Sequence, residues 1–180
     1  MNRTKRLAYH GIFLALFIVT AKISFTVFPP VPFTLQSAAV ILCALVMGWQ
    51  SAFTVAIYIL LGIAGLPVFA MGGGVGYLLY PTFGFTLGFL VCGFVTGLIY
   101  SKKKTVKNSV AAVTVGTLII YICGISYYLL LKNFYFGESV DIWKTLMTFY
   151  VVFIPSDLLK GAICIAIARR VKPLAFSVKN

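Results

Sequence analysis

The sequence predicts an all-α integral membrane protein, with six transmembrane helices in one domain spanning residues 1–180. Of the 180 residues, 61% are apolar and 10% are charged, whereas a soluble domain is about 25% charged. Residues 23–101, 79 in a row, contain no Asp, Glu, Lys or Arg, which leaves room for three spans of about 20 residues each. The 15 Lys and Arg lie beside apolar runs, so the basic surplus indicates a lipid bilayer rather than a nucleic acid as partner.

Six apolar stretches each correspond to one predicted helix. They cover residues 7–28, 34–48, 51–66, 83–100, 109–131 and 144–168. Helices are expected because lipid offers no water to pair with free backbone groups. No A-x-A-like cleavage site follows the first stretch, so it is predicted to be an uncleaved helix rather than a signal peptide. The breaks between stretches are proline, glycine or polar clusters, which interrupt helices: residues 29–32, 48–50, 65–81, 102–104 and 132–141.

The distribution of Lys and Arg predicts the orientation. With six spans, 11 of the 15 basic residues lie on the side shared by both termini and the loop after the fourth helix. Because Lys and Arg concentrate in cytoplasmic segments, both termini are predicted to be cytoplasmic. Residues 29–32, 65–81 and 132–144 are then expected outside the cell.

Asp157 and Lys160 are the candidate ligand-binding residues. They lie three residues apart on one face of the last predicted helix, and ionisable groups inside a span indicate a functional site. Pro155 is expected to bend the helix close by. An intrahelical ion pair with a purely structural role is the alternative. A carboxylate that accepts beside an ammonium that donates suits a neutral ligand group with N–H donors next to a carbonyl, such as a urea, an amide or a nucleobase edge.

Other motifs carry weaker predictions. The glycine-rich run GGGVG at residues 72–76 lacks the lysine of a phosphate-binding loop, so it is interpreted as an external lid with Met71 and Tyr77 as apolar contacts. The sequence contains no Walker motif, and any ATP hydrolysis is expected in partner subunits. Four scattered cysteines predict packing rather than a metal or cofactor site, and no catalytic residue is predicted. His10 is expected to be an interfacial residue, and Lys22 to extend to the membrane surface.

Small residues four apart allow two helices to approach closely. One such step lies in the first predicted helix, at Gly11 and Ala15, and two lie in the fourth, Gly84 with Gly88 and Gly93 with Gly97. Packing within the protein is the prediction for the fourth helix.

Four sequence blocks together resemble the BioY family, the biotin-specific substrate-binding subunits (S components) of energy-coupling factor (ECF) transporters. They are PVPFTLQ at residues 30–36, LLGIAGLPVF at 60–69, YPTFGF at 80–85 and IPSDLLK at 154–160. The blocks occur in the family's order and spacing, and the resemblance covers essentially the whole chain.

The resemblance implies a six-helix S-component-like bundle in the bacterial plasma membrane, which captures biotin and docks on an EcfT-like transmembrane coupling subunit with two ATPase subunits. Gly11 and Ala15 are implied to contact the coupling subunit. The residues implied to bind biotin come from the last helix and from two external loops: Asp157, Lys160, Phe33, Gln36, Gly73, Gly74 and Tyr77.

The sequence departs from the family pattern where the ligand's carboxylate is expected. Two glycines of the usual GPTGGY motif are aromatic here, and Thr86 stands where some relatives carry a basic residue. Three kinds of group stay candidates for binding the carboxylate: Lys22, backbone N–H groups of the glycine-rich loop, and hydroxyl groups. An S component for another vitamin, or an intramembrane enzyme using Asp157, are the alternative functions.

Overall fold

A computed structural model of the chain describes residues 3–28 and 31–171. The described part contains six α-helices, matching the six apolar stretches, together with two short strands and three short helical turns. In chain order the elements are α1 (Arg3–Lys22), β1 (Ser24–Phe28), β2 (Val31–Thr34), α2 (Gln36–Met47), η1 (Gly48–Gln50), α3 (Ser51–Ile63), η2 (Val75–Leu79), α4 (Phe83–Lys102), α5 (Val106–Leu130), η3 (Leu131–Tyr135) and α6 (Ile142–Arg170).

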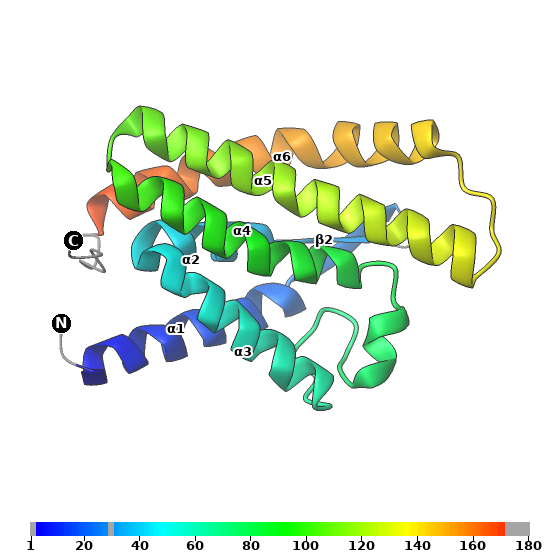
Figure 1. Cartoon of the computed structure of the whole chain (residues 1–180), viewed down its shortest axis with the longest axis horizontal. Coiled ribbons are helices and arrows are strands. Elements are labelled where there is room, and N and C mark those ends of the chain that lie inside the picture. Colours follow the sequence, from blue (N-terminus) through cyan, green and yellow to red (C-terminus); the bar gives the residue numbers. More distant parts are fainter. Residues whose placement is uncertain (1–2, 29–30, 172–180) are drawn as a thin grey trace.

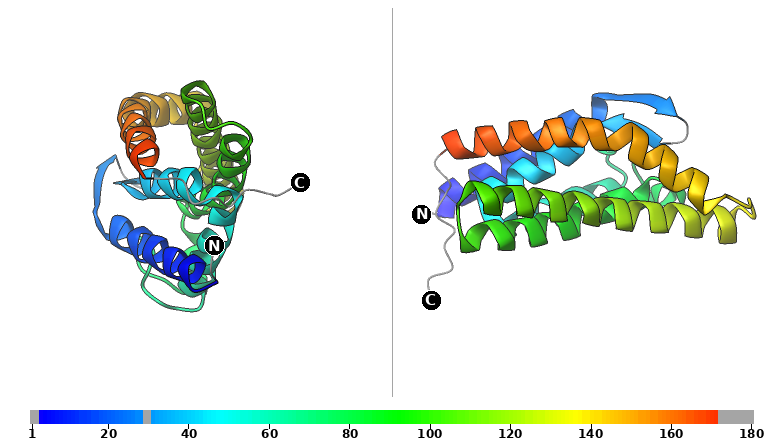
Figure 2. Two further views of the ribbon diagram at one scale, coloured as in Figure 1. Left: turned by 90° about the vertical axis from the view of Figure 1, so that its left-hand side faces the viewer. Right: turned by 90° about the horizontal axis from the view of Figure 1, so that it is seen from above.

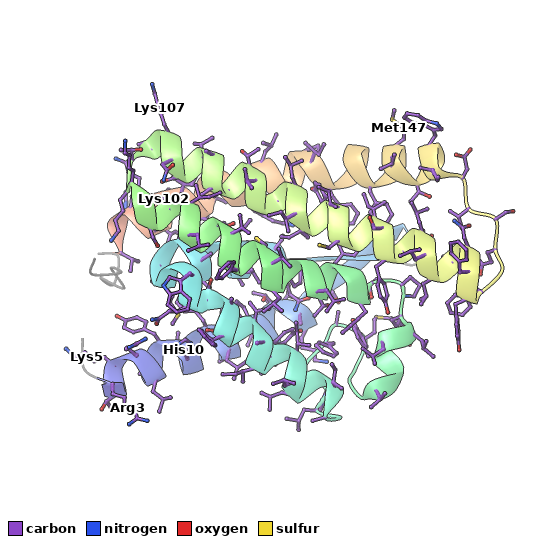
Figure 3. All side chains as sticks on the ribbon, in the orientation of Figure 1. Arg3, Lys5, His10, Lys102, Lys107 and Met147 are labelled. Carbon is purple, nitrogen blue, oxygen red and sulfur yellow. The ribbon has the colours of Figure 1, made fainter. Side chains whose placement is uncertain are left out.

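The helices form an elongated bundle (Figure 1). One end, called the terminal end below, carries the start of α1, the end of α6 and the turn between α4 and α5. The opposite end, called the hairpin end, carries the two strands, the 64–82 loop and the α5–α6 connection. Arg3, Lys5, Lys102 and Lys107 all lie at the terminal end (Figure 3). The basic clusters that predicted the orientation therefore share one end of the molecule.

Three helical stretches in the described part are long and apolar enough to cross a membrane: residues 36–63, 83–102 and 106–135. The first of these is not one straight helix, because Gln36 Nε2 donates to the Tyr58 hydroxyl at 2.7 Å. A straight helix would separate these residues by about 33 Å, so the chain reverses at η1 into α2 and α3. At about 18–20 Å each, both helices are shorter than the hydrocarbon core of about 30 Å. Gln36, at the start of α2, consequently lies buried inside the bundle.

The predicted end of the first helix is wrong. The interpretation of residues 7–28 as one helix extends it through Phe28, whereas α1 ends at Lys22 and residues 24–28 form strand β1. This strand pairs antiparallel with β2, with Ser24 opposite Thr34 and Phe28 opposite Val31. Phenylalanine, threonine and valine favour strands, and the following prolines disfavour a helical residue before them.

Glycines hold α4 against its neighbours, as predicted for the fourth helix. A Cβ atom built on Gly84 would lie 2.2 Å from Cβ of Tyr127 in α5, and one on Gly97 would lie 2.2 Å from the carbonyl carbon of Gly48 in η1. Gly93 faces Ser51, whose hydroxyl donates to the Gly93 carbonyl oxygen at 2.8 Å. These distances confirm internal packing for both small-residue steps of α4.

Helix α6 runs alongside α5 and α2 and contains Pro155 within its length. The helix bends between its two ends, as the right-hand view of Figure 2 shows. Proline provides no N–H for the helical ladder and bends helices, so the bend fits the predicted effect of Pro155. It brings the next turn of α6, with Asp157 and Lys160, against the start of α2.

Candidate ligand-binding site

The ion pair predicted in the last helix is formed and lies inside the protein. Lys160 Nζ lies 2.8 Å from Asp157 Oδ1, and the two side chains are only 10% and 9% exposed. Their spacing of three residues puts both on the inner face of α6. Burial of two charges is costly in free energy unless further hydrogen bonds satisfy them. The hydrogen-bonding groups around the pair therefore decide whether it is stable inside the protein.

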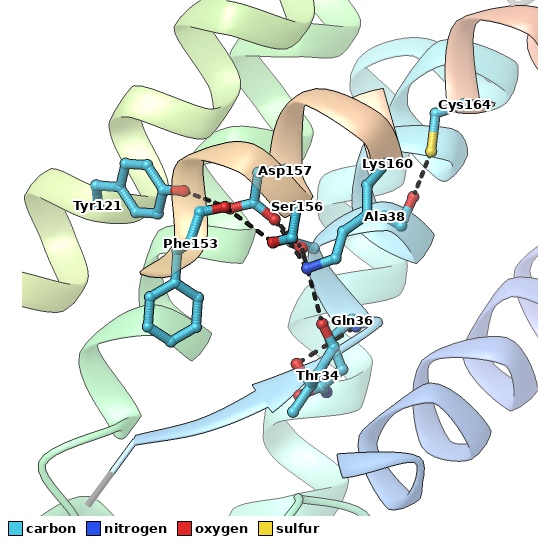
Figure 4. Close-up of polar contacts among 10 residues, drawn as sticks. Thr34, Gln36, Ala38, Tyr121, Phe153, Ser156, Asp157, Lys160 and Cys164 are labelled. Atoms are coloured by element: carbon cyan, nitrogen blue, oxygen red, sulfur yellow. Dashed lines mark hydrogen bonds and ion pairs between the residues drawn. The ribbon is translucent and has the colours of Figure 1, made fainter. Parts of the chain in front are cut away.

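Three other elements contribute hydrogen bonds to the pair (Figure 4). The Tyr121 hydroxyl of α5 donates to Asp157 Oδ2 at 2.5 Å, and the Ser37 hydroxyl of α2 donates to Oδ1 at 3.3 Å. Lys160 Nζ donates to the carbonyl oxygen of Thr34, at the end of β2, at 3.1 Å. The carboxylate and the ammonium are therefore held in fixed positions by α2, α5 and the hairpin.

A cavity extends from the ion pair toward the hairpin end. Its walls combine the charged pair with hydroxyl and amide groups and with a set of aromatic rings, and its lining residues are Thr34, Gln36, Ser37, Ala70, Tyr77, Thr82, Phe85, Thr86, Phe89, Ile120, Tyr121, Phe153, Asp157 and Lys160. Apolar walls with a few convergent polar groups are typical of small-molecule sites. The cavity is therefore the candidate functional site.

Four of the residues predicted to bind a ligand lie together around this cavity: Gln36, Tyr77, Asp157 and Lys160. The Gln36 amide is oriented by the Tyr58 hydroxyl, which in turn donates to the carbonyl oxygen of Val68 at 3.0 Å. Tyr77 belongs to the loop, and burial raises its pKa, so its phenol stays protonated. The loop and α2 thus present neutral polar groups to the cavity.

Gly73 and Gly74 do not line the cavity. The Gly74 N–H donates to the carbonyl oxygen of Gly62 at 2.7 Å, and a Cβ on Gly73 would lie 2.0 Å from the carbonyl oxygen of Leu66. These glycines fold the loop tightly onto the end of α3, and their contact with a ligand stays a prediction. Phe33 pairs with Phe25 in the hairpin, but its side chain lies outside the described part of the chain.

Several groups that line the cavity were not predicted from the sequence, among them Tyr121, Ser37 and Phe153. Tyr121 lies in an otherwise apolar stretch, where a tyrosine is an ordinary residue of a membrane helix and gives no sign of a binding role. Its role appears only because its hydroxyl reaches Asp157, 36 positions away in the chain. A buried tyrosine usually finds a hydrogen-bond partner, which is the signal that could have indicated a polar neighbour.

Two further polar residues of α1 have structural partners. Lys22 Nζ donates to the carbonyl oxygen of Phe69 in the loop at 2.9 Å, so its ammonium binds the loop instead of extending freely to the membrane surface. His10 Nδ1 lies 2.7 Å from the Thr54 hydroxyl of α3. Both contacts tie α1 to the α3 and loop region.

Comparison with known proteins adds to this geometry. The BioY family model matches residues 1–176. The chain belongs to the BioY family. It is 41% identical to the biotin transporter BioY of Thermotoga maritima, over 94% of this chain and 97% of that protein. It is 34% identical to the probable biotin transporter BioY of Pyrococcus horikoshii, over 94% and 98%.

A solved structure supports the BioY fold. The crystal structure of the S-component for biotin from an ECF-type ABC transporter superposes with a TM-score of 0.84, covering 97% of this chain and 96% of that one at 22% identity. The resemblance seen in the four sequence blocks is thereby confirmed at the level of family and fold.

Proposed function

We propose that this BioY-family protein captures biotin outside the cell and takes part in its uptake as the substrate-binding subunit of an ECF-type importer. The observation that carries the proposal is the buried Asp157–Lys160 pair, held at the end of a cavity by hydrogen bonds from three other elements. Relatives matched over nearly their whole length are biotin transporters by name, which supports the same ligand.

The chemistry of the pair matches the head of biotin. Its ureido ring offers two N–H donors and one carbonyl acceptor, so a carboxylate and an ammonium side by side complement it. Tyr121 and Ser37 fix the direction of the Asp157 carboxylate. Phe85, Phe89 and Phe153 line the same cavity and provide apolar surface for the fused rings. Gln36 and Tyr77 contact the ligand from the loop side in this proposal, with Phe33, Gly73 and Gly74 in segments that close over it.

The proposed topology has six membrane segments, α1 to α6, of which the short α2 and α3 cover only part of the hydrocarbon core as helix, with the terminal end in the cytoplasm of a bacterial cell. Its support is the gathering of basic residues at that end (Figure 3), because Lys and Arg are enriched on the cytoplasmic side. In that orientation the cavity lies toward the outside, because Thr34, Ala70 and Tyr77 of the hairpin end line it.

The proposed partner is an EcfT-like coupling subunit carrying two ATPase subunits, and the proposed contact is the face of α1 at Gly11 and Ala15. A Cβ atom on Gly11 would meet nothing within 4 Å, and both residues are exposed. Every glycine of α4, by contrast, is packed against a neighbour of the same chain. A small-residue step without an internal partner suits a second helix at close range.

Equilibrium binding to the full-length protein in detergent tests the function. Biotin should bind and withstand competition from a panel of other vitamins, and mass spectrometry should recover it chemically unchanged. Preferential binding of another vitamin would identify an S component of different specificity. Conversion of biotin would favour an intramembrane enzyme using Asp157.

A further inference from the structure

A second hollow of the molecule is a groove between α5 and α6, called the α5–α6 groove below. It has a volume of about 350 Å³, and among the described residues it shares only Tyr121 and Asp157 with the lining of the candidate ligand cavity. Its other walls consist of aliphatic side chains, small residues and two threonines. Large apolar side chains of both helices line it and are exposed at the surface: Val110, Leu118, Ile154 and Leu158. The groove therefore opens on the outside of the bundle, which faces lipid in a membrane protein.

The groove is about as long as one leaflet of a bilayer is thick. On α5 it extends from Val110 to Tyr121, and on α6 from Ile154 to Ile165. Each stretch advances by 11 residues, or about 16 Å of helix, and half of a hydrocarbon core of about 30 Å is about 15 Å. Because α5 begins and α6 ends at the terminal end (Figure 1), the groove occupies the half of the bundle nearer that end. An acyl chain of this leaflet can thus lie along its whole length.

Two cations lie just beyond the terminal end of the groove. Lys107 precedes Val110 by three residues in α5, and Arg169 follows Ile165 by four residues in α6. Side chains three or four residues apart share one face of a helix, so both cations continue the faces that line the groove. Both are exposed, and Lys107 points away from the bundle (Figure 3).

None of the three acidic side chains of the sequence lies at the terminal end. Glu138 pairs with Lys132, and Asp157 pairs with Lys160. Asp141 immediately precedes α6, at the hairpin end. Within the described part of the chain, the positive charge beyond the groove is therefore not matched by an acidic side chain. An anionic group from outside the chain would complement this charge.

We propose that the α5–α6 groove binds one acyl chain of an anionic phospholipid, with the lipid phosphate at Lys107 and Arg169. Such a lipid matches both parts of the site, because apolar walls favour a hydrocarbon chain and basic residues at the ends of transmembrane helices attract anionic headgroups. In the orientation proposed above, the lipid belongs to the cytoplasmic leaflet. The lipid site rests on the groove and its two cations, and not on the identity of the ligand in the cavity.

Lipid titration of the full-length protein in detergent, read by native mass spectrometry, tests this site. Phosphatidylglycerol is the anionic probe, and phosphatidylcholine with the same acyl chains is the zwitterionic one. Each Lys or Arg near a membrane surface strengthens the binding of anionic lipid by about fivefold, so phosphatidylglycerol is expected to bind at least about tenfold more tightly. Equal affinities for the two lipids would overturn the proposal. Binding of glycerol phosphate as tight as that of the whole lipid would also overturn it, because the acyl chain would then contribute nothing.

Two charge variants locate the headgroup. Lys107→Gln combined with Arg169→Gln should bring the affinity for phosphatidylglycerol to within about threefold of that for phosphatidylcholine. Arg3→Gln combined with Lys5→Gln is the matched control, because it removes the same charge from the same end of the molecule (Figure 3) but from α1, and it should keep the preference. A preference kept in the first variant, or lost equally in both, would contradict the position of the phosphate.

A bulky side chain in the groove locates the acyl chain. Ala162 is exposed and lines the groove, so Ala162→Phe should weaken both lipids by at least about fourfold, because each CH₂ group kept out of the groove costs about that factor. Thr114→Phe, at an exposed position of the facing wall, should act in the same way. Ala111→Phe is the control, since Ala111 is exposed on α5 but does not line the groove. Thermal unfolding without added lipid identifies the folded variants, and unchanged lipid binding in a folded groove variant would overturn the groove as the site.

Discussion

Asparagine at position 157 keeps the shape of the side chain but removes the charge that Lys160 faces at 2.8 Å. Two effects follow from the structure. In the ligand-free protein the Lys160 ammonium stays buried, at 10% exposure, without its counter-charge, and removing one partner of a buried pair costs about 3–5 kcal/mol of stability. In the complex, a urea N–H loses its charged acceptor, and such a hydrogen bond contributes about 1.5–3 kcal/mol.

The expected result for Asp157→Asn is therefore a loss of biotin affinity of at least about tenfold, since about 1.4 kcal/mol corresponds to a factor of ten. Lys160→Ala should weaken binding by a similar factor because it removes the donor to the carbonyl. Isothermal titration calorimetry measures the affinity, and thermal unfolding without ligand measures the accompanying change in stability. Full affinity in either single variant would refute the assignment and leave the pair with a structural role only.

A double variant separates stability from binding. Asp157→Asn combined with Lys160→Met removes both charges, so the ligand-free protein should recover most of its stability while binding stays lost. The matched control is the pair Lys132 and Glu138, which is more exposed at 19% and 55%. Exposed pairs contribute about 0–1 kcal/mol, so Glu138→Gln should leave both biotin affinity and stability nearly unchanged.

Three further predictions concern topology, packing and coupling. A single cysteine at Lys103, in a background without the four native cysteines, should be labelled only from the cytoplasm; labelling of intact cells by an impermeant reagent would contradict the six-span orientation. Gly97→Ala should destabilise the protein by about 1–3 kcal/mol, because the new Cβ would lie 2.2 Å from the Gly48 carbonyl carbon. Gly11→Ala, with nothing within 4 Å, is the control, and equal unfolding temperatures for the two variants would argue against the packing of α4. Gly11→Leu or Ala15→Leu should abolish transport by the assembled complex while the isolated subunit still binds biotin; lost binding would show that this face packs internally.

Local patterns determined most of the helical architecture. Apolar stretches predicted all six helices, because a segment in lipid must be apolar along its length and must pair its own backbone groups. The same reasoning singled out Asp157 and Lys160, because charged residues inside a span are costly in free energy and are therefore an indication of a functional site. The small-residue steps of α4 likewise predicted its close packing, because only small side chains allow a neighbouring backbone to approach closely.

Tertiary packing decided what these patterns leave open. Residues 24–28 are apolar enough to continue α1, and their pairing with β2 decided that they form a strand. The break at residues 48–50 was predicted, and the contact of Gln36 with Tyr58 shows how closely α2 and α3 fold back on each other there. Tyr121, Ser37 and the Thr34 carbonyl became part of the site because four elements converge on one ion pair. Hydropathy and spacing are properties of neighbouring residues, whereas a binding site depends on which side chains from distant segments meet, and that is set by the packing of the whole bundle.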